Sequence, residues 1–188
     1  MMPVVRINDA TFADLKLIAS WFGTKTPADT LDRVVKEAMD QLGLERDDEP
    51  DEAVVSEGGA IQFDVAPGLA FTKPLSATIN GKAIPSPRWS SILLTMIAQL
   101  KSKGLDGDKL VRELGIPAKA AKFEDEGFKY HPDLGVSVQG QSASDAWKEV
   151  ERLAKKWHIP VTVEFWWRQN PKAQHPGRTG VLKAGSQP

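Results

Sequence analysis

The pattern of hydrophobic and polar positions in the first 44 residues changes its period once. From Val4 to Asn8 the period is two, which is typical of a strand because successive side chains point to opposite faces. From Ala10 to Phe22 the apolar residues recur at helical spacing, and one stripe consists of Leu15, Ile18, Ala19 and Phe22. Gly23 follows as a helix stop. The pattern predicts one strand and one amphipathic helix.

A second amphipathic helix is predicted from Pro27 to Leu42. Its start carries three signals: Thr26 as the N-cap, Pro27 at the first helical position, and Asp29 to complete a capping box. Gly43 follows the last apolar residue. The predicted buried face consists of Leu31, Val34, Val35, Ala38, Met39 and Leu42.

The rest of the chain mixes strands and helices, and predicts a compact α+β domain over residues 59–188. Asn80-Gly81 is a strong hairpin signal. Ser86 and Ser144 are predicted helix caps, and residues 134–167 read as strand, helix, strand, either a βαβ unit or an α+β equivalent. Strands are predicted at 61–65, 69–71, 77–79, 82–84, 127–130, 134–138 and 161–167, and helices at 88–103, around 108–114 and at 145–157.

Charge is unevenly distributed, although the formal net charge is only −1. Residues 44–57 hold seven acidic residues and one arginine, which predicts an acidic flexible linker over residues 45–58. From Lys73 to Pro188 there are 18 Lys and Arg against 11 Asp and Glu. The linker either serves as a spacer or occupies the basic surface when no partner is bound there.

Composition restricts the classes of protein to which the chain can belong. It has no cysteine, which excludes disulfides and thiolate chemistry. No run of 18 apolar residues is present, and the N-terminus lacks the pattern of a signal peptide. We therefore expect a soluble, cytoplasmic protein.

The order and spacing of the first 44 residues resemble the ribbon-helix-helix family of dimeric DNA-binding proteins (Arc and methionine-repressor-like). The resemblance implies a homodimer in which two strands pair and enter the major groove. Its base-reading face would hold Val4, Arg6 and Asn8. Thr24, Lys25 and Thr26 would lie against the DNA backbone at the start of the second helix. Asp29 departs from this pattern, because its carboxylate competes for the same amides.

The chain also resembles the SeqA family of replication regulators at two places. One is the N-terminal strand and helix pair, which is similar to the oligomerisation module of that family. The other is Ile84-Pro85-Ser86-Pro87-Arg88-Trp89, which is similar to a tryptophan-containing loop before a helix in its DNA-binding domain. Lys82 and Arg88 belong to a second basic set, together with Lys101 and Lys103, and are further candidate DNA contacts.

The C-terminal tail combines aromatic and basic residues, a combination suited to nucleic-acid contact. Asn170-Pro171 and Pro176-Gly177 predict a loop. Its candidate DNA contacts are Arg168, Lys172, Arg178 and Lys183. A structural role for these cations is equally compatible with the sequence. For Trp166 and Trp167 we favour positions on a central strand, one on each face.

Other chemistry has weak support in the sequence. The histidines 131, 158 and 175 lack metal-ligand spacing, and Gly81-Lys82 lacks the rest of a phosphate-binding loop. Asp133 and Glu164 are the only basis for a metal-dependent nuclease, and the usual Glu-x-Lys is missing after Glu164. We therefore expect no catalytic residues, no bound metal and no cofactor.

These observations predict a dimeric, sequence-specific DNA-binding regulator, acting in transcriptional repression or in control of plasmid or phage replication or partition. The expected partners are double-stranded DNA and a second copy of the chain, with a possible protein partner for the C-terminal domain. The alternatives are an oligomeric protein-interaction module without DNA readout, and a nuclease. An antitoxin is also compatible, although antitoxins of this type usually carry short unfolded tails.

Overall fold

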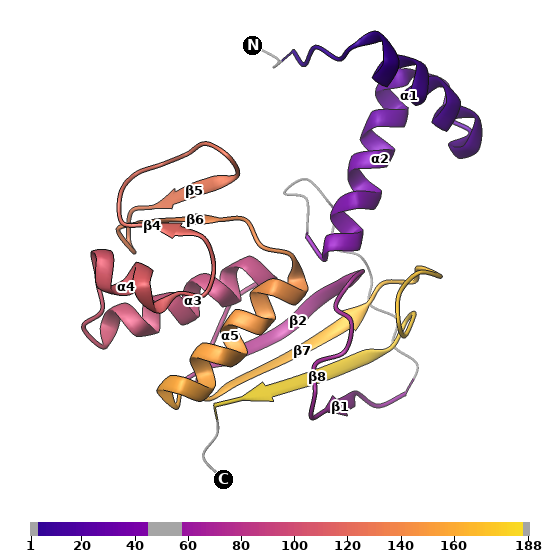
Figure 1. Cartoon of the computed structure of the whole chain (residues 1–188). Helices are drawn as coiled ribbons and strands as arrows, with labels where there is room; N and C mark the ends of the chain where they lie inside the picture. Colours follow the sequence, from indigo (N-terminus) through magenta and orange to yellow (C-terminus); the bar gives the residue numbers. More distant parts are fainter. Residues whose placement is uncertain (1–3, 45–57, 186–188) are drawn as a thin grey trace. The chain divides into compact units, whose positions relative to one another are not determined.

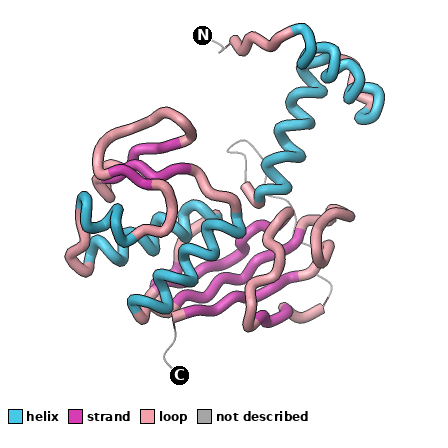
Figure 2. The backbone as a smooth tube through the Cα atoms, in the orientation of Figure 1, coloured by secondary structure: helices cyan, strands magenta, loops and turns pink. Residues whose placement is uncertain are grey.

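The computed structural model describes residues 4–44 and 58–185 of the chain (Figures 1 and 2). The chain divides into two compact units, residues 1–39 and residues 40–188, called here the N-terminal unit and the C-terminal unit. The mixed α+β class is confirmed. The predicted acidic linker at 45–58 falls, apart from Gly58, outside the described residues.

The N-terminal unit is built on a helical hairpin. α1 (Asp9–Phe22) begins where the Asn8 Oδ1 accepts a hydrogen bond from the Thr11 N–H at 2.7 Å, and it ends at Gly23 with φ 65°. α2 (Pro27–Leu42) extends to the first residues of the C-terminal unit. The Arg33 Nη1 donates to the Phe22 carbonyl at 3.0 Å and so ties the two helices together. Both predicted helices are confirmed.

The predicted strand at Val4–Asn8 does not form in the single chain. No secondary structure is assigned to these residues, and within the described part of the chain no segment pairs with them. A strand exists only through hydrogen bonds to a neighbour, since its own backbone cannot satisfy them. The ribbon of the ribbon-helix-helix arrangement is therefore not present in one copy of the chain.

The C-terminal unit contains a five-stranded sheet in the order β1-β8-β7-β2-β3. β1 pairs parallel with β8, and the other neighbours are antiparallel. The strands are β1 (Ile61–Phe63), β2 (Thr72–Ile79), β3 (Lys82–Ala83), β7 (Val161–Trp167) and β8 (Thr179–Ala184). Asn80 and Gly81 join β2 to β3 with φ of 52° and 76°, as the hairpin signal predicted.

Two helices, α3 (Trp89–Ser102) and α5 (Ala143–Trp157), contribute most of the core that covers one face of this sheet (Figure 1). Register places Ala77, Val163 and Leu182 side by side on that face, and all three belong to the core. Thr78, Thr162 and Lys183 lie side by side on the other face. The described core cluster contains no strand residue of this second face, and its helices pack on the first face. We call the second face the open face.

A smaller sheet has the order β4-β6-β5, formed by β4 (Ala118–Lys119), β5 (Phe128–His131) and β6 (Val136–Gln139). α4 (Gly107–Glu113) precedes it. The predicted βαβ unit over residues 134–167 is wrong, because β6 and β7 belong to different sheets. The segment is the α+β equivalent that the sequence left open.

Three local predictions need correction. α3 begins at Trp89 with Arg88 as its N-cap, because the Ser91 Oγ accepts from the Arg88 N–H at 2.9 Å; Ser86 does not cap it. α5 is capped by Ser142, whose Oγ accepts from the Asp145 N–H at 3.2 Å. The predicted strand at 69–71 does not form, whereas the one at 77–79 is confirmed as the end of a longer strand, β2, which has an irregularity between Pro74 and Ser76.

The end of the tail is a strand, and not part of a loop. β8 pairs with β7 along six positions, from Trp166 opposite Thr179 to Val161 opposite Ala184. β7 itself matches its predicted bounds and is the central strand of the sheet. Trp166 and Trp167 are both buried on it, and register directs them to opposite faces, as predicted.

Candidate nucleic-acid interface

The N-terminal unit leaves most of its large apolar side chains exposed. Val4 is 87% exposed, Val5 77%, Leu17 69% and Trp21 88%, whereas Leu15 and Thr30 are its only described buried residues. Several residues predicted to form the buried face of α2 are exposed too, including Leu31 at 41% and Val35 at 42%. The amphipathic pattern is thus present, but one copy of the chain does not bury it.

The predicted base-reading residues Val4, Arg6 and Asn8 all lie in the irregular segment before α1 and are exposed. The Arg6 side chain has no hydrogen bond or ion pair with the rest of the described chain. Asn8 has a structural role that the sequence analysis did not assign to it, because its Oδ1 caps α1. Its side-chain amide nitrogen is not used in that bond.

The start of α2 confirms Thr26 as the predicted N-cap, but the Asp29 carboxylate bonds the Thr26 hydroxyl and not its backbone N–H, so the reciprocal half of the predicted capping box does not form. The Asp29 N–H donates to the Thr26 Oγ1 at 3.2 Å, and that hydroxyl donates to the Asp29 Oδ2 at 2.7 Å. The Thr24 and Thr30 hydroxyls lie 2.6 Å apart. Lys25 between these threonines is exposed. One helix amide is therefore already satisfied by Thr26, and the Asp29 carboxylate adds negative charge at the start of α2.

The six C-terminal candidate cations do not form one cluster. Lys82 lies on β3, an edge strand, and Arg88 is the N-cap of α3. Lys172 and Arg178 are exposed in the loop between β7 and β8, while Lys183 lies on the open face near the end of β8. At about 3.3 Å per residue, Arg178 and Lys183 are roughly 16 Å apart along the chain direction.

Arg168 has a different environment from the other candidates. It is only 9% exposed, and its Nε lies 3.6 Å from the Asp40 Oδ1. Its backbone N–H donates to the Phe71 carbonyl at 2.8 Å. A guanidinium held in this way serves the packing of the C-terminal unit.

The two carboxylates of the nuclease alternative belong to different sheets, Asp133 to the turn between β5 and β6 of the small sheet and Glu164 to a strand of the large one. Asp133 lies in the turn before β6, where its carbonyl accepts from the Lys101 Nζ at 2.7 Å. Glu164 lies on β7, with the Ser76 Oγ at 3.5 Å from its Oε2. Among the described residues, no group of three or more His, Cys, Asp or Glu side chains is placed to hold a metal ion.

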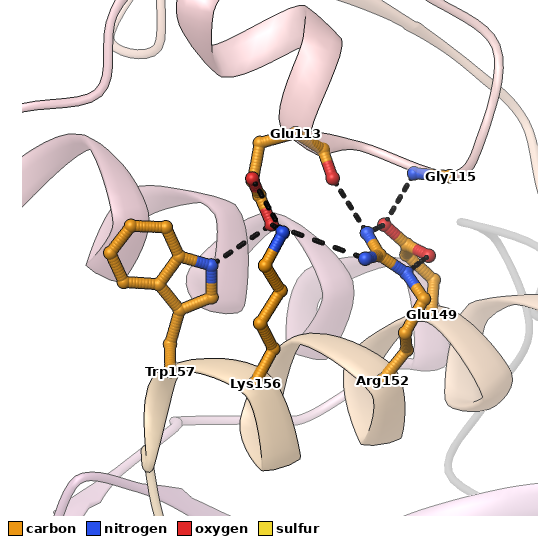
Figure 3. A network of polar contacts seen from close by, with 6 residues as sticks. All are labelled: Glu113, Gly115, Glu149, Arg152, Lys156 and Trp157. Carbon is orange, nitrogen blue, oxygen red and sulfur yellow. Dashed lines mark hydrogen bonds and ion pairs between the residues drawn. The ribbon is translucent and has the colours of Figure 1, made fainter.

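A polar network between α4 and α5 was not anticipated from the sequence (Figure 3). The Glu113 carboxylate accepts from the Trp157 Nε1 at 3.0 Å and pairs with the Lys156 Nζ at 2.8 Å. The Arg152 Nη2 donates to the Glu113 carbonyl at 2.6 Å and to the Glu149 Oε1 at 2.7 Å. The bond from Lys156, together with that from Trp157, lowers the pKa of Glu113 against the opposing effect of burial, and the bond to Glu149 raises the pKa of Arg152.

Glu149 completes this network by anchoring the loop after α4. Its Oε1 accepts from the Gly115 N–H at 2.8 Å, and the residue is 4% exposed. A buried carboxylate needs such partners, since an unpaired one would be costly. The charged groups of the network pair with one another and bond the loop after α4, so we describe the network as a structural clamp between α4 and α5.

Comparison with known proteins identified no matching family model, no matching curated protein and no matching solved structure. In the described part of the chain, none of the helices has the length and apolar character needed to cross a membrane.

Proposed function

We propose that this chain is a homodimeric regulator that binds double-stranded DNA through its N-terminal unit. The supporting observation is the incompleteness of that unit in one copy of the chain. Its apolar side chains are exposed, and residues 4–8 precede α1 without a strand partner. Both features are explained if the functional form contains a second copy.

Pairing of residues 4–8 with the same residues of a second copy gives the strand its partner and covers exposed apolar side chains. In an antiparallel pair, Val5 and Ile7 share one face and cover apolar helix residues such as Val35, while Arg6 projects from the other face. A two-stranded ribbon of this kind fits the major groove. A bidentate hydrogen bond from Arg6 to a guanine is the main base contact in this proposal, and Val4 and Asn8 flank Arg6.

Phosphate attraction has to come partly from outside the N-terminal unit. Residues 1–45 hold five Lys and Arg against seven Asp and Glu. Lys25 supplies a cation near the start of α2, but Asp29 opposes it there. The exposed cations Lys172, Arg178 and Lys183 belong to a unit with a surplus of positive charge, and they supply the sequence-independent part of the binding.

The proposal is tested with the full chain, because no part of it has been shown to fold alone. Selection from random genomic fragments yields a preferred site, and binding to it is measured over a salt series for the wild type, Arg6→Ala and the control Lys16→Ala. We expect Arg6→Ala to lose about 1–3 kcal/mol at one base pair of the site. Lys16→Ala, an exposed change on α1, retains the sequence preference.

Two observations favour a second function, an oligomeric interaction module without DNA readout. The net negative charge of residues 1–45 and the Asp29 carboxylate at the start of α2 both repel phosphate. In this case the protein dimerises but shows no sequence preference, and Arg6→Ala changes nothing. Binding that is lost steeply with salt and is unaffected by Arg6→Ala would place the DNA contacts in the C-terminal unit.

A further inference from the structure

An open cavity of about 330 Å³ lies at the surface of the C-terminal unit, between the first turns of α3 and the small sheet. Leu93 and Leu94 of α3 and Val138 of β6 form its apolar wall. Ser90 on α3 and Lys129 and His131 on β5 supply polar groups. Its volume is within the range of small-molecule sites, and its lining has the usual character of such sites, largely apolar with a few polar groups.

The cavity is walled by a hydrogen-bonded end of the small sheet. The Gly140 N–H donates to the Gly127 carbonyl at 3.0 Å, and the Gln139 Nε2 donates to the Glu126 carbonyl at 2.9 Å. These bonds join the ends of β5 and β6 beside the lining residues Gly127 and Gly140. A wall fixed before binding lowers the entropic cost of receiving a ligand.

The charge of the lining has one sign. Lys129 is its one charged side chain near neutral pH, and no carboxylate belongs to the lining. The Lys129 ammonium has no hydrogen bond or ion pair with the rest of the described chain. Burial lowers the pKa of His131, and the nearby Lys129 lowers it further, so the imidazole is neutral near pH 7. Ser90 lies in the first turn of α3, where the helix dipole adds partial positive charge.

From this geometry we propose that the cavity binds a small organic carboxylate with an apolar body, with the carboxylate at Lys129 and the apolar part against Leu93, Leu94 and Val138. The two parts of the lining select two parts of one molecule. An inorganic anion would leave the apolar wall unused, and an apolar amine would bring a second cation to Lys129. This site is separate from the residues of the proposed DNA interface and does not depend on them.

The probes are phenylacetate, benzylamine and acetate, which separate the contributions of charge and apolar body. Binding to the full chain is followed by NMR through the imidazole signals of the three histidines. We expect phenylacetate to shift the His131 signals in a saturable manner, with His158 and His175 as internal controls outside the cavity. Benzylamine and acetate should bind at least tenfold more weakly. Equal binding of benzylamine, or shifts of all three histidines alike, would overturn the proposal.

Variants locate the site. Lys129→Ala should weaken phenylacetate binding by about two- to fivefold, as for a solvent-exposed ion pair, while Lys129→Glu should reverse the preference toward benzylamine. The matched control is Lys122→Ala, a 68% exposed lysine of the preceding loop that pairs with Glu124. Ser90→Trp, at an exposed position of the lining, should fill the cavity and abolish binding. Unchanged binding in a Ser90→Trp protein with a normal thermal unfolding transition contradicts the assignment.

Discussion

The two units of this chain differ in how far their apolar side chains are buried. In the C-terminal unit, Met96 and Leu100 are fully buried and even Trp89 is only 2% exposed. In the N-terminal unit, Trp21 is 88% exposed and Val5 is 77% exposed. One copy of the chain therefore completes the C-terminal core, whereas the N-terminal unit needs an additional surface to remove its apolar residues from water.

The largest expected effect follows from truncating the complete core. Leu100→Ala leaves a cavity beneath α3 and should lower the free energy of unfolding by about 2–5 kcal/mol. The matched change Leu17→Ala, at a residue 69% exposed in the single chain, should cost less than about 1 kcal/mol in dilute monomer. Urea unfolding of both variants at several protein concentrations measures the difference. Equal losses under dilute conditions would contradict the comparison.

Two glycines with similar backbone conformations give the next contrast. Gly185 in the C-terminal unit and Gly23 in the N-terminal unit have φ of 73° and 65°. A Cβ at Gly185 would collide with the backbone carbonyl of Ile159, whereas a Cβ at Gly23 meets nothing within 4 Å. We expect Gly23→Ala to cost about 1 kcal/mol from the left-handed conformation alone, and Gly185→Ala about 3 kcal/mol or more. Thermal unfolding of the two variants measures both costs.

The third prediction concerns association, and it tests whether the N-terminal unit is completed by a second copy. Val35→Asp puts a charge on the exposed apolar face of α2 and should weaken dimerisation by about 2 kcal/mol or more. Sedimentation equilibrium should then detect monomer at concentrations where the wild type is dimeric. Lys16→Asp introduces the same carboxylate at a position already charged, and should leave the dimer intact. A wild type that is monomeric at all concentrations would refute the proposed assembly.

Local signals in the sequence were sufficient for several elements of both units. The Thr26-Pro27-Asp29 cap located the start of α2, and Asn80-Gly81 located the β2–β3 hairpin. Both signals act over a few residues and need no information on distant packing. β7 was predicted with its observed bounds, because apolar residues alternate with Thr162 and Glu164 from Val161 onward and end in Phe165-Trp166-Trp167.

Long-range pairing could not be derived in the same way. β8 was predicted as part of a loop, since its few alternating residues follow Pro176-Gly177 and gain their stability only from pairing with β7. The separation of β6 and β7 into two sheets also depends on partners distant in the sequence. For Arg168, a basic residue beside two tryptophans predicted nucleic-acid contact, and only the fold reveals its ion pair with Asp40.

The smallest predicted effect concerns the polar clamp between α4 and α5 in the C-terminal unit. The bonds from Lys156 and Trp157 hold the pKa of Glu113 below its ordinary value of 4.5. A carboxyl whose pKa is lower in the folded state stabilises the fold above its unfolded pKa, and this stabilisation is lost as pH falls through the folded pKa.

Glu113→Gln should therefore cost about 1 kcal/mol at pH 7. The difference from the wild type should shrink as the pH falls below 4.5, which urea unfolding at pH 7 and near pH 3 would show. Glu124→Gln is the control, because its carboxylate is 52% exposed and pairs only with the exposed Lys122. If Glu113→Gln and Glu124→Gln cost the same at both pH values, the clamp adds nothing to the stability of the C-terminal unit beyond an ordinary surface ion pair.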